Sequence, residues 1–419
     1  MHTYRELFRT PQFRPFFATS ALQVAASTMS GLALATLVYD ATASALLAAL
    51  SMFGSSLAQV IGAALLMSAA DRLPPRAATT GMALVFALAT AALAVPGLPL
   101  PAAFAILLAQ GVVAAVGGGV RYGLLNEVLP KDGYLLGRSV LNMCAGLMQI
   151  GGFALGGLLV VTLSARGTLL IAAALYLAGA AVARYGLARR PPRATGRPSP
   201  AETWRINALL WSSGPRRRAY LALWVPNGLV VGCESLFVPY DPAGAGLLFA
   251  CAALGMLIGD TVAGRFISAR PWRGRLAAPL QLLLAAPYLF FVLRPALPVA
   301  FALAMLASVG FAASLLYQER LMALTPDEFT GQALGLHSSG MLTLQGVAAA
   351  LAGSLAQWTS PAPAMSVMAV ASVAVSLALS WAGHRATRRG TRAPGAVDSV
   401  ALHGTSEASD VTGTADRPA

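Results

Sequence analysis

Twelve runs of about 20 predominantly apolar residues, separated by short charged or Pro/Gly-rich breaks, fill most of this 419-residue chain. A helix needs roughly 20 apolar residues to cross the hydrocarbon core of a bilayer, so each run is a candidate membrane span. The expected spans are 16–38, 46–69, 78–96, 101–120, 139–162, 168–187, 219–240, 243–266, 276–293, 297–318, 334–358 and 364–383. The first run is longer than the apolar core of a cleavable signal peptide, and further spans follow it, so we expect it to be a membrane span as well. We therefore expect an all-α membrane protein with 12 transmembrane helices.

The composition supports this expectation and excludes two other classes of protein. Apolar residues make up 57% of the chain and charged residues only 11%, whereas an ordinary soluble domain has about 25% charged residues. A soluble enzyme is therefore excluded. A disordered protein is excluded as well, because disorder requires low hydrophobicity together with high net charge.

The basic residues predict the orientation of the chain in the membrane. An even number of spans puts both termini on one side, and positive charge collects in cytoplasmic loops. With a cytoplasmic N-terminus, 27 of the 29 basic residues fall on the inner side and only Arg166 and Arg294 fall outside. The net charge of +13 is thus explained by topology, and no nucleic-acid partner is expected. We expect a multi-pass protein of a bacterial inner membrane with both termini in the cytoplasm.

The longest cytoplasmic connection divides the spans into six plus six. Residues 1–187 are expected to form an N-terminal six-helix bundle and residues 219–386 a C-terminal one. Between them, residues 188–218 form a cytoplasmic linker with a short amphipathic helix, in which Trp204, Ala208 and Trp211 share one face and lie at the membrane surface. The alternative is an unstructured tether. Residues 387–419 are rich in Gly, Ser, Thr, Ala and Asp and are expected to be a disordered cytoplasmic tail.

Four short motifs carry a resemblance to a known family. They are Leu37-Val38-Tyr39-Asp40 followed by Thr42, Ser44 and Leu46; Ala70-Asp71-Arg72 with Arg76; Gln110-Gly111 with Ala114 and Ala115; and Gly152-Phe153-Ala154-Leu155-Gly156-Gly157. Together they resemble the major facilitator superfamily, and within it the bacterial branch of macrolide-efflux-like and enterobactin-exporter-like permeases. The resemblance implies two six-helix bundles that work by alternating access around a central site. It also implies export of a hydrophobic or amphiphilic small molecule, such as a drug, antibiotic or siderophore, in exchange for protons.

The chain departs from the family pattern at several positions. Leu107 stands where the span-four motif has arginine, and Ala26-Ser27 stands where the branch often has Gly-Asp in span one. Both the usual arginine and the usual acid of a proton relay are therefore absent. Asp71 and Arg72 lie where the superfamily places its gating motif, although Met67, Pro74 and Pro75 replace other residues of that motif.

Ionisable and polar residues inside spans are the candidates for substrate or proton binding. Glu234 in span seven is the foremost, because an acid in a spanning helix is costly and suggests a function. Asn227 lies seven residues earlier on the same face. Four neutral polar residues inside spans complete the set: Gln23, Gln110, Asn142 and Gln149. Alternatively, Glu234 only pairs with Arg294 or with water at the outer surface. The neutral residues could likewise serve only as hydrogen-bonding groups between helices.

Two further positions have weaker functional interpretations. Asp260, near the inner end of span eight and followed by Arg265, is expected to be the second half's counterpart of the Asp71 gate. His337 in span eleven could titrate near neutrality. A lone histidine is nevertheless more often a hydrogen-bonded packing residue, and we favour that interpretation.

The energy source is expected to be a gradient. A nucleotide-binding loop of the G-x-x-x-x-G-K-[ST] type is excluded, since the only lysine, Lys131, does not follow a glycine. The three cysteines have no metal-ligand spacing, so no metal or other cofactor is expected, and we find no constellation for an enzyme. The expected partners are a small-molecule substrate, the proton and the lipid bilayer, with the chain as a monomer. Two rival functions are an uncoupled facilitator or uptake permease, and a membrane sensor or assembly partner on a transporter fold.

Overall fold

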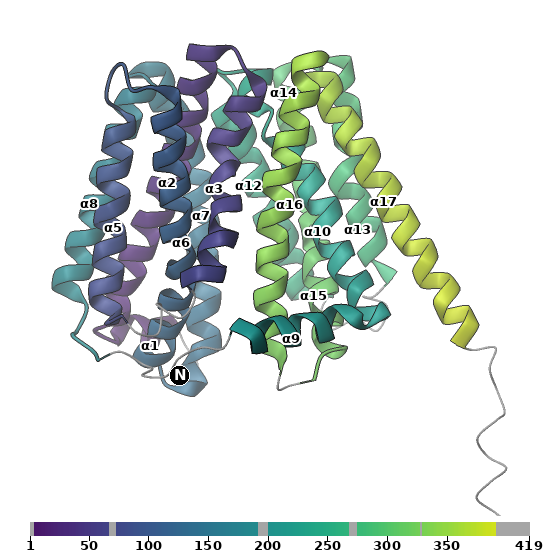
Figure 1. Cartoon of the computed structure of the whole chain (residues 1–419), viewed down its shortest axis with the longest axis horizontal. Helices are drawn as coiled ribbons and strands as arrows, with labels where there is room; N and C mark the ends of the chain where they lie inside the picture. The colour runs from purple at the N-terminus through teal and green to yellow at the C-terminus, as the bar shows by residue number, and fades with distance from the viewer. Residues whose placement is uncertain (1–3, 67–72, 192–199, 268–274, 327–328, 391–419) are drawn as a thin grey trace, which may run out of the picture. The chain divides into compact units, whose positions relative to one another are not determined.

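The computed structural model describes residues 4–66, 73–191, 200–267, 275–326 and 329–390 (Figure 1). The described residues up to Leu377 belong to one compact unit, and those from Ala378 onward belong to a second. The described residues contain helices and no strand. The helices up to the linker are α1 (Tyr4–Arg9), α2 (Phe13–Thr42), α3 (Ala45–Leu66), α5 (Pro75–Leu93), α6 (Leu100–Val128), α7 (Lys131–Thr162) and α8 (Ala165–Gly186).

The helices after α8 are more often interrupted. They are α9 (Pro200–Ser212), α10 (Gly214–Glu234), α11 (Phe237–Tyr240), α12 (Ala245–Val262) with the π-helix η1 (Ala263–Ile267), α13 (Ala277–Ala285) with the 3₁₀-helix η3 (Ala286–Leu293), α14 (Leu297–Val309), the 3₁₀-helix η4 (Gly310–Ala312), α15 (Ala313–Ala323), α16 (Thr330–Trp358) and α17 (Pro361–Gly390). Each of the twelve expected spans corresponds to one helix or to one run of consecutive helices.

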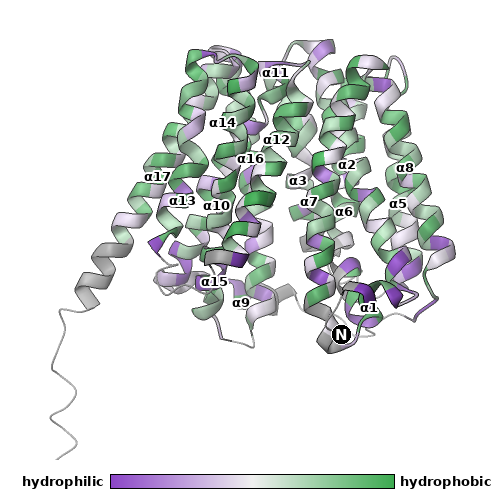
Figure 2. Ribbon diagram, turned by 180° about the vertical axis from the view of Figure 1, so that it is seen from behind, coloured by the Kyte–Doolittle hydropathy of each residue, from purple (hydrophilic) through white to green (hydrophobic). Residues whose placement is uncertain are grey.

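Ten of these helical segments are long and apolar enough to cross a membrane, and Leu100–Ala115 and Ala277–Leu293 are shorter apolar helices. Figure 2 shows hydrophobic residues along the lengths of the helices and hydrophilic residues gathered mostly at the end that carries α1. We call this end the α1 end and the opposite one the far end. The chain is a multi-pass all-α membrane protein, as the sequence predicts.

Prolines define where several helices begin. Pro75 and Pro361 are the first residues of α5 and α17, and α10 has Pro215 in its first turn. Proline suits these positions, because the first-turn amide has no helical acceptor and the ring presets a helical φ. At the start of α8, the hydroxyl of Ser164 instead accepts a hydrogen bond of 3.1 Å from the Gly167 amide.

The helices pack as two groups within the first unit. In the N-terminal half, α2 packs against α3, α7 and α8, while α5 packs against α6 and α8, and α3 against α6. In the C-terminal half, α10 packs against α15 and α16, and α12 and α13 pack against α14. The halves are joined chiefly by α3 with α16 and by α7 with α12, and the short helix α11 also packs against α2 and α3.

Small residues permit close approach where the halves meet. A Cβ atom added to Gly157 of α7 would lie 2.8 Å from the Cα atom of Gly246 in α12. Likewise, a Cβ atom on Gly353 of α16 would lie 2.6 Å from the Cα atom of Leu46 in α3. Beside the first contact, the rings of Phe153 and Phe249 stack with centroids 4.8 Å apart. Close packing of this kind drives helix association in lipid, where no hydrophobic effect operates between helices.

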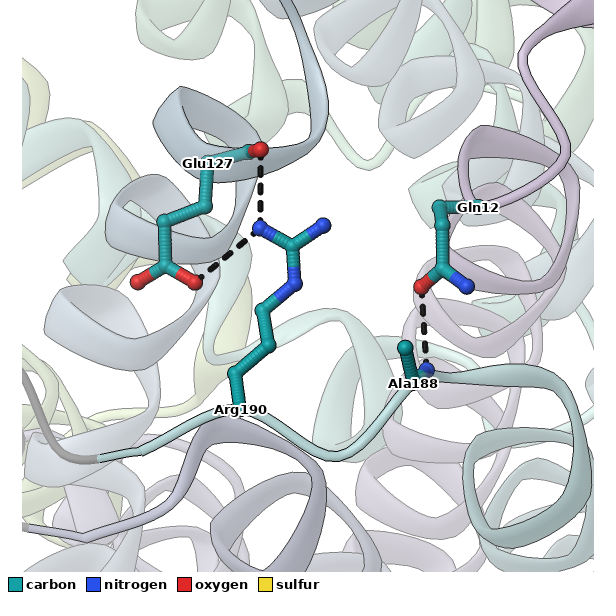
Figure 3. A network of polar contacts seen from close by, with 4 residues as sticks. All are labelled: Gln12, Glu127, Ala188 and Arg190. Carbon is teal, nitrogen blue, oxygen red and sulfur yellow. Dashed lines mark hydrogen bonds and ion pairs between the residues drawn. The ribbon is translucent and has the colours of Figure 1, made fainter.

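The chain after α8 is attached to the N-terminal half at the α1 end (Figure 3). The Arg190 guanidinium donates to the Glu127 backbone carbonyl at 2.8 Å and forms an ion pair with its carboxylate at 3.2 Å. The Ala188 amide donates to Gln12 Oε1 at 2.9 Å. These contacts hold residues 188–190 against the ends of α6 and α2.

Helix α9, by contrast, packs on the C-terminal half. Trp211 stacks on Trp224 of α10 with ring centroids 5.5 Å apart and planes 10° from parallel. Leu210 is fully buried, and Gln332 of α16 donates to Asn207 Oδ1 at 2.7 Å. Trp204, however, is 71% exposed. The two tryptophans expected to share one membrane-facing side therefore have different surroundings, because Trp211 is used for packing on the protein.

Candidate functional site

Two adjoining cavities lie inside the N-terminal half, with volumes of about 330 and 190 Å³. Helices α2, α5, α6 and α8 line both, and α3 also lines the smaller one. Four residues belong to both linings: Ser27, Phe86, Ala114 and Tyr176. We call the pair the N-terminal cavity. Along α2 the lining extends from Phe16 to Leu34, which at 1.5 Å per residue is about 27 Å.

The lining of this cavity is polar but almost uncharged. Gln23 lines the larger part, and Gln59 and Gln110 line the smaller. The Gln110 amide donates to the Thr90 hydroxyl at 3.4 Å. Arg121 is the only charged residue in the described lining. Polar groups converging in an otherwise apolar pocket are typical of a small-molecule site.

Two polar atoms at the α1 end of the cavity lack partners. The Thr19 Oγ1 atom and the Arg121 Nε atom are buried, and neither has a hydrogen bond to any described residue. Thr19 as a whole is 1% exposed. Buried polar groups are normally hydrogen-bonded. These two atoms are therefore available to hydrogen-bond a ligand at this end of the cavity.

A second polar site lies in the C-terminal half around Glu234, which is 6% exposed. The hydroxyl groups of Tyr288 and Ser308 lie beside its carboxyl group. Glu234 Oε1, Tyr288 OH and Ser308 Oγ are all buried, yet no hydrogen bond of ordinary geometry joins any of them to a described residue. We call these three residues the Glu234 cluster. It contains one acid and no basic residue.

The Glu234 cluster coincides with breaks in three helices. Helix α10 ends at Glu234, Tyr288 lies in the 3₁₀-helix η3, and Ser308 precedes the 3₁₀-helix η4 by two residues. A 3₁₀ stretch inside a long helix often marks a hinge or a strained segment. The acid is thus placed where the helices around it are least regular.

Asn227 lies on α10, seven residues before Glu234 and nearer the α1 end. It is 3% exposed, and its amide donates to the Leu223 carbonyl at 2.7 Å and to the Ser314 hydroxyl at 2.9 Å. Asn227 and Glu234 therefore both face the α14–α15 segment, as their spacing of seven residues predicts. The Asn227 amide thus has two hydrogen-bond acceptors, whereas Glu234 Oε1 has no hydrogen bond to a described residue.

A comparison with protein families decides the identity of the fold. Residues 16–240 match the family model described as Major Facilitator Superfamily. The chain belongs to this superfamily. The fold class expected from the sequence is thereby confirmed, and the chain is a member of a transporter superfamily.

Solved structures of several transporters have a similar fold. A POT family transporter in complex with a thioalcohol-conjugated peptide has a TM-score of 0.73 and 11% identity, over 90% of this chain and 96% of the other. A peptide transporter POT in complex with sulfate has a TM-score of 0.71 and 15% identity, over 90% and 95% of the two chains. A bacterial homolog of the human lysosomal transporter Spinster, in an inward-facing and unoccupied conformation, has a TM-score of 0.63 and 12% identity, over 88% and 95%. A comparison with curated proteins finds no match.

The remaining candidate residues of this superfamily member lie elsewhere. Asn142 is exposed and Gln149 half-buried on α7, and neither lines the N-terminal cavity. Asp260 in α12 and Arg265 in η1 are both exposed toward the α1 end. Asp71 and Arg72, the expected first gate, lie outside the described residues. The structure thus brings Gln23 and Gln110 to one cavity and Glu234 and Asn227 to one interface.

His337 is a buried, hydrogen-bonded residue, as we favoured from the sequence. Its Nδ1 atom lies 3.3 Å from the Trp224 Nε1–H donor, and its Nε2 atom lies 3.4 Å from the Gln318 side-chain amide. Because an indole N–H can only donate, Nδ1 is the acceptor of the bond from Trp224. His337 thus belongs to the packing between α10 and α16.

Several residues of these sites were not predicted from the sequence. Arg121 was assigned to a loop because the expected fourth span stopped at residue 120, but α6 continues to Val128 and carries Arg121 within the helix. Tyr288 and Ser308 were overlooked, since a hydroxyl within an apolar span usually bonds its own helix. These two residues could have been noticed in the sequence, because each is a hydroxyl-bearing residue inside an otherwise apolar run.

Proposed function

We propose that the chain is a secondary transporter that exports a hydrophobic or amphiphilic small molecule in exchange for protons. The observation that carries the proton-coupling part is Glu234, a buried acid without a cationic partner among the described residues. Burying the ionised carboxylate in this environment would cost many kcal/mol, so the acid carries a proton in this conformation. Its release in the other conformation would couple the proton gradient to transport.

The substrate part rests on the N-terminal cavity. The larger part, with a volume of about 330 Å³, falls in the range of pockets for drug-sized molecules, about 300–1,000 Å³, and the adjoining part adds about 190 Å³. The lining combines the amides of Gln23 and Gln110 with the aromatic rings of Phe86 and Tyr176. Such a lining suits an amphiphile, and we assign Asn142 and Gln149 to secondary contacts on α7.

The moving parts follow from the organisation of the chain. We assign residues 1–187 and 219–386 to two bodies that rock against each other, with 188–218 as the linker and 387–419 as a tail. Asp71 with Arg72, and Asp260 with Arg265, are assigned to gates at the cytoplasmic side. The α1 end faces the cytoplasm of a bacterial inner membrane, because it carries the excess of arginine, and the protein acts as a monomer.

The test is accumulation of fluorescent amphiphilic drugs in pump-deficient bacteria, with and without an uncoupler. Wild-type protein is expected to lower accumulation, and both the uncoupler and Glu234→Gln are expected to abolish this effect. Glu319→Gln is the matched control, since Glu319 is an exposed acid on α15. Efflux that is indifferent to Glu234→Gln and to the uncoupler would identify an uncoupled facilitator. Unchanged accumulation throughout, with the protein present in the membrane, would contradict drug efflux and favour a dedicated metabolite or a sensor role.

A further inference from the structure

Arg121 occupies an unusual place for an arginine in a membrane protein. It lies seven residues before the last residue of α6, which is about 10 Å inside the helix end. Arginines near helix ends normally extend their charged group toward the water. Arg121 instead lines the larger part of the N-terminal cavity, and its Nε atom is buried.

The positive charge of Arg121 has no negative partner among the described residues. No acid belongs to the lining of either part of the cavity. Glu127, the nearest acid along α6, forms its ion pair with Arg190 at 3.2 Å. Arg121 as a whole is half-buried, so a ligand in the cavity can reach its charge, and an ionisable residue that lines a cavity of a membrane protein is by default a candidate for ligand or ion binding.

A second, independent observation points to a ligand at the same place. The Thr19 hydroxyl, on a residue that is 1% exposed, lines the same cavity and has no hydrogen-bond partner among the described residues. Gln23 follows one turn further along α2. An arginine, a free hydroxyl and an amide at one end of a cavity form a set of donors that matches a carboxylate or a phosphate.

The rest of the cavity has a different character. Ser27 and Ser30 already donate their hydroxyl hydrogens to Val24 and Ser27 carbonyl groups, so they present mainly oxygen lone pairs. Phe86 and Met82 add apolar surface. The cavity therefore has a donor-rich end at Arg121 and an amphiphilic remainder.

We propose that the N-terminal cavity binds an organic anion, with its carboxylate or phosphate on Arg121 and Thr19 and its body extending along α2 past Gln23 toward Ser27 and Tyr176. This inference rests on the proposed function in one respect: the bound anion is the exported amphiphile. It narrows the substrate class from amphiphiles in general to amphiphiles with an anionic end.

The test is a binding titration on the purified full-length protein in phosphatidylcholine nanodiscs, with empty nanodiscs as background. The probe is 11-(dansylamino)undecanoic acid, and its methyl ester is the neutral counterpart of the same shape. Wild type is expected to bind the acid at least tenfold more tightly than the ester. Arg121→Gln is expected to remove this preference, so that the acid and the ester bind with similar affinity, and Arg121→Lys to retain it in part.

Two control variants make the result specific to the cavity. Arg9→Gln removes an exposed arginine at the same end and is expected to change nothing. Ala114→Phe fills the region shared by both parts of the cavity and is expected to weaken both probes. Equal binding of the acid and the ester to the wild type would overturn the proposal. A preference for the acid that survives in Arg121→Gln would overturn it as well. So would acid binding that persists in Ala114→Phe, since the anion would then bind outside the cavity.

One further arm separates the two sources of such an anion. Phosphatidylglycerol added to the nanodiscs would displace the acid from wild type if a lipid headgroup were the natural occupant of Arg121, and this would overturn the assignment to a transported amphiphile. Binding that is insensitive to phosphatidylglycerol supports that assignment. Because binding is measured without transport, a protein that binds the anion but exports nothing would contradict the proposed function and not the site.

Discussion

The close contact between Gly157 and Gly246 can be tested by adding a single methyl group, which would force the two halves apart. In Gly157→Ala, the new Cβ atom would lie 2.8 Å from the Gly246 Cα atom. Carbon atoms prefer separations of about 3.5–4.0 Å, so α7 and α12 must move apart by roughly 0.7 Å or more. Overpacking of this kind costs about 1–3 kcal/mol. If the contact exists only in this conformation, the equilibrium shifts away from it by about 5- to 150-fold.

Double electron–electron resonance can measure this shift. Spin labels at Leu163 and Ala243, which are exposed near the far ends of α7 and α12, report the separation of the halves after the three native cysteines are replaced. Gly157→Ala is expected to broaden the distance distribution or move it to longer values. The matched control is Gly151→Ala in the same helix, where a Cβ atom meets nothing within 4 Å. Identical distributions in wild type and Gly157→Ala, or an equal shift in Gly151→Ala, would refute the argument.

Three other perturbations have defined outcomes. Trp211→Ala is expected to increase tryptic cleavage within α9 about tenfold or more, since it removes the stack on α10, whereas Trp204→Ala, at a 71% exposed side chain, should leave the rate unchanged. Glu234→Gln is expected to melt at or above the wild-type temperature in detergent, because the amide is neutral without taking up the proton that the buried acid needs; a clear loss of stability would contradict the absence of a cationic partner. Arg190→Gln is expected to lower the free energy of unfolding by about 1 kcal/mol or less in chemical denaturation, since the pair with Glu127 is partly exposed, and a larger loss would contradict a minor role.

The fold could be predicted from the sequence because lipid imposes a simple rule. A segment that crosses a bilayer must be helical and apolar for about 20 residues, and this rule located the ten long apolar helices and the two shorter ones among the described residues. It was less exact at the α1 end, where α6 and α7 extend beyond the apolar runs. Polar residues can continue a helix outside the hydrocarbon region, so hydropathy does not mark the true helix end.

The candidate sites were only partly predictable, because they depend on which helices meet. Glu234 and Gln110 stand out as polar residues in apolar runs, and the structure places one in a buried cluster and the other in a cavity lining. Their partners, Tyr288 and Thr90, could not be assigned, since the partners come from other helices. Hydropathy gives no information on the rotation of a helix about its axis, and this rotation decides which residues face one another.

The two attachments of the linker limit how far the halves can separate at the α1 end. Arg190 is held on the N-terminal half by Glu127, and α9 begins at Pro200 and packs on the C-terminal half through Trp211. Ten residue steps between Arg190 and Pro200 can span at most about 36 Å when fully extended. Any conformational cycle that keeps both attachments must therefore work within this length of chain, and a wider opening would first have to detach α9 or break the Arg190 pair.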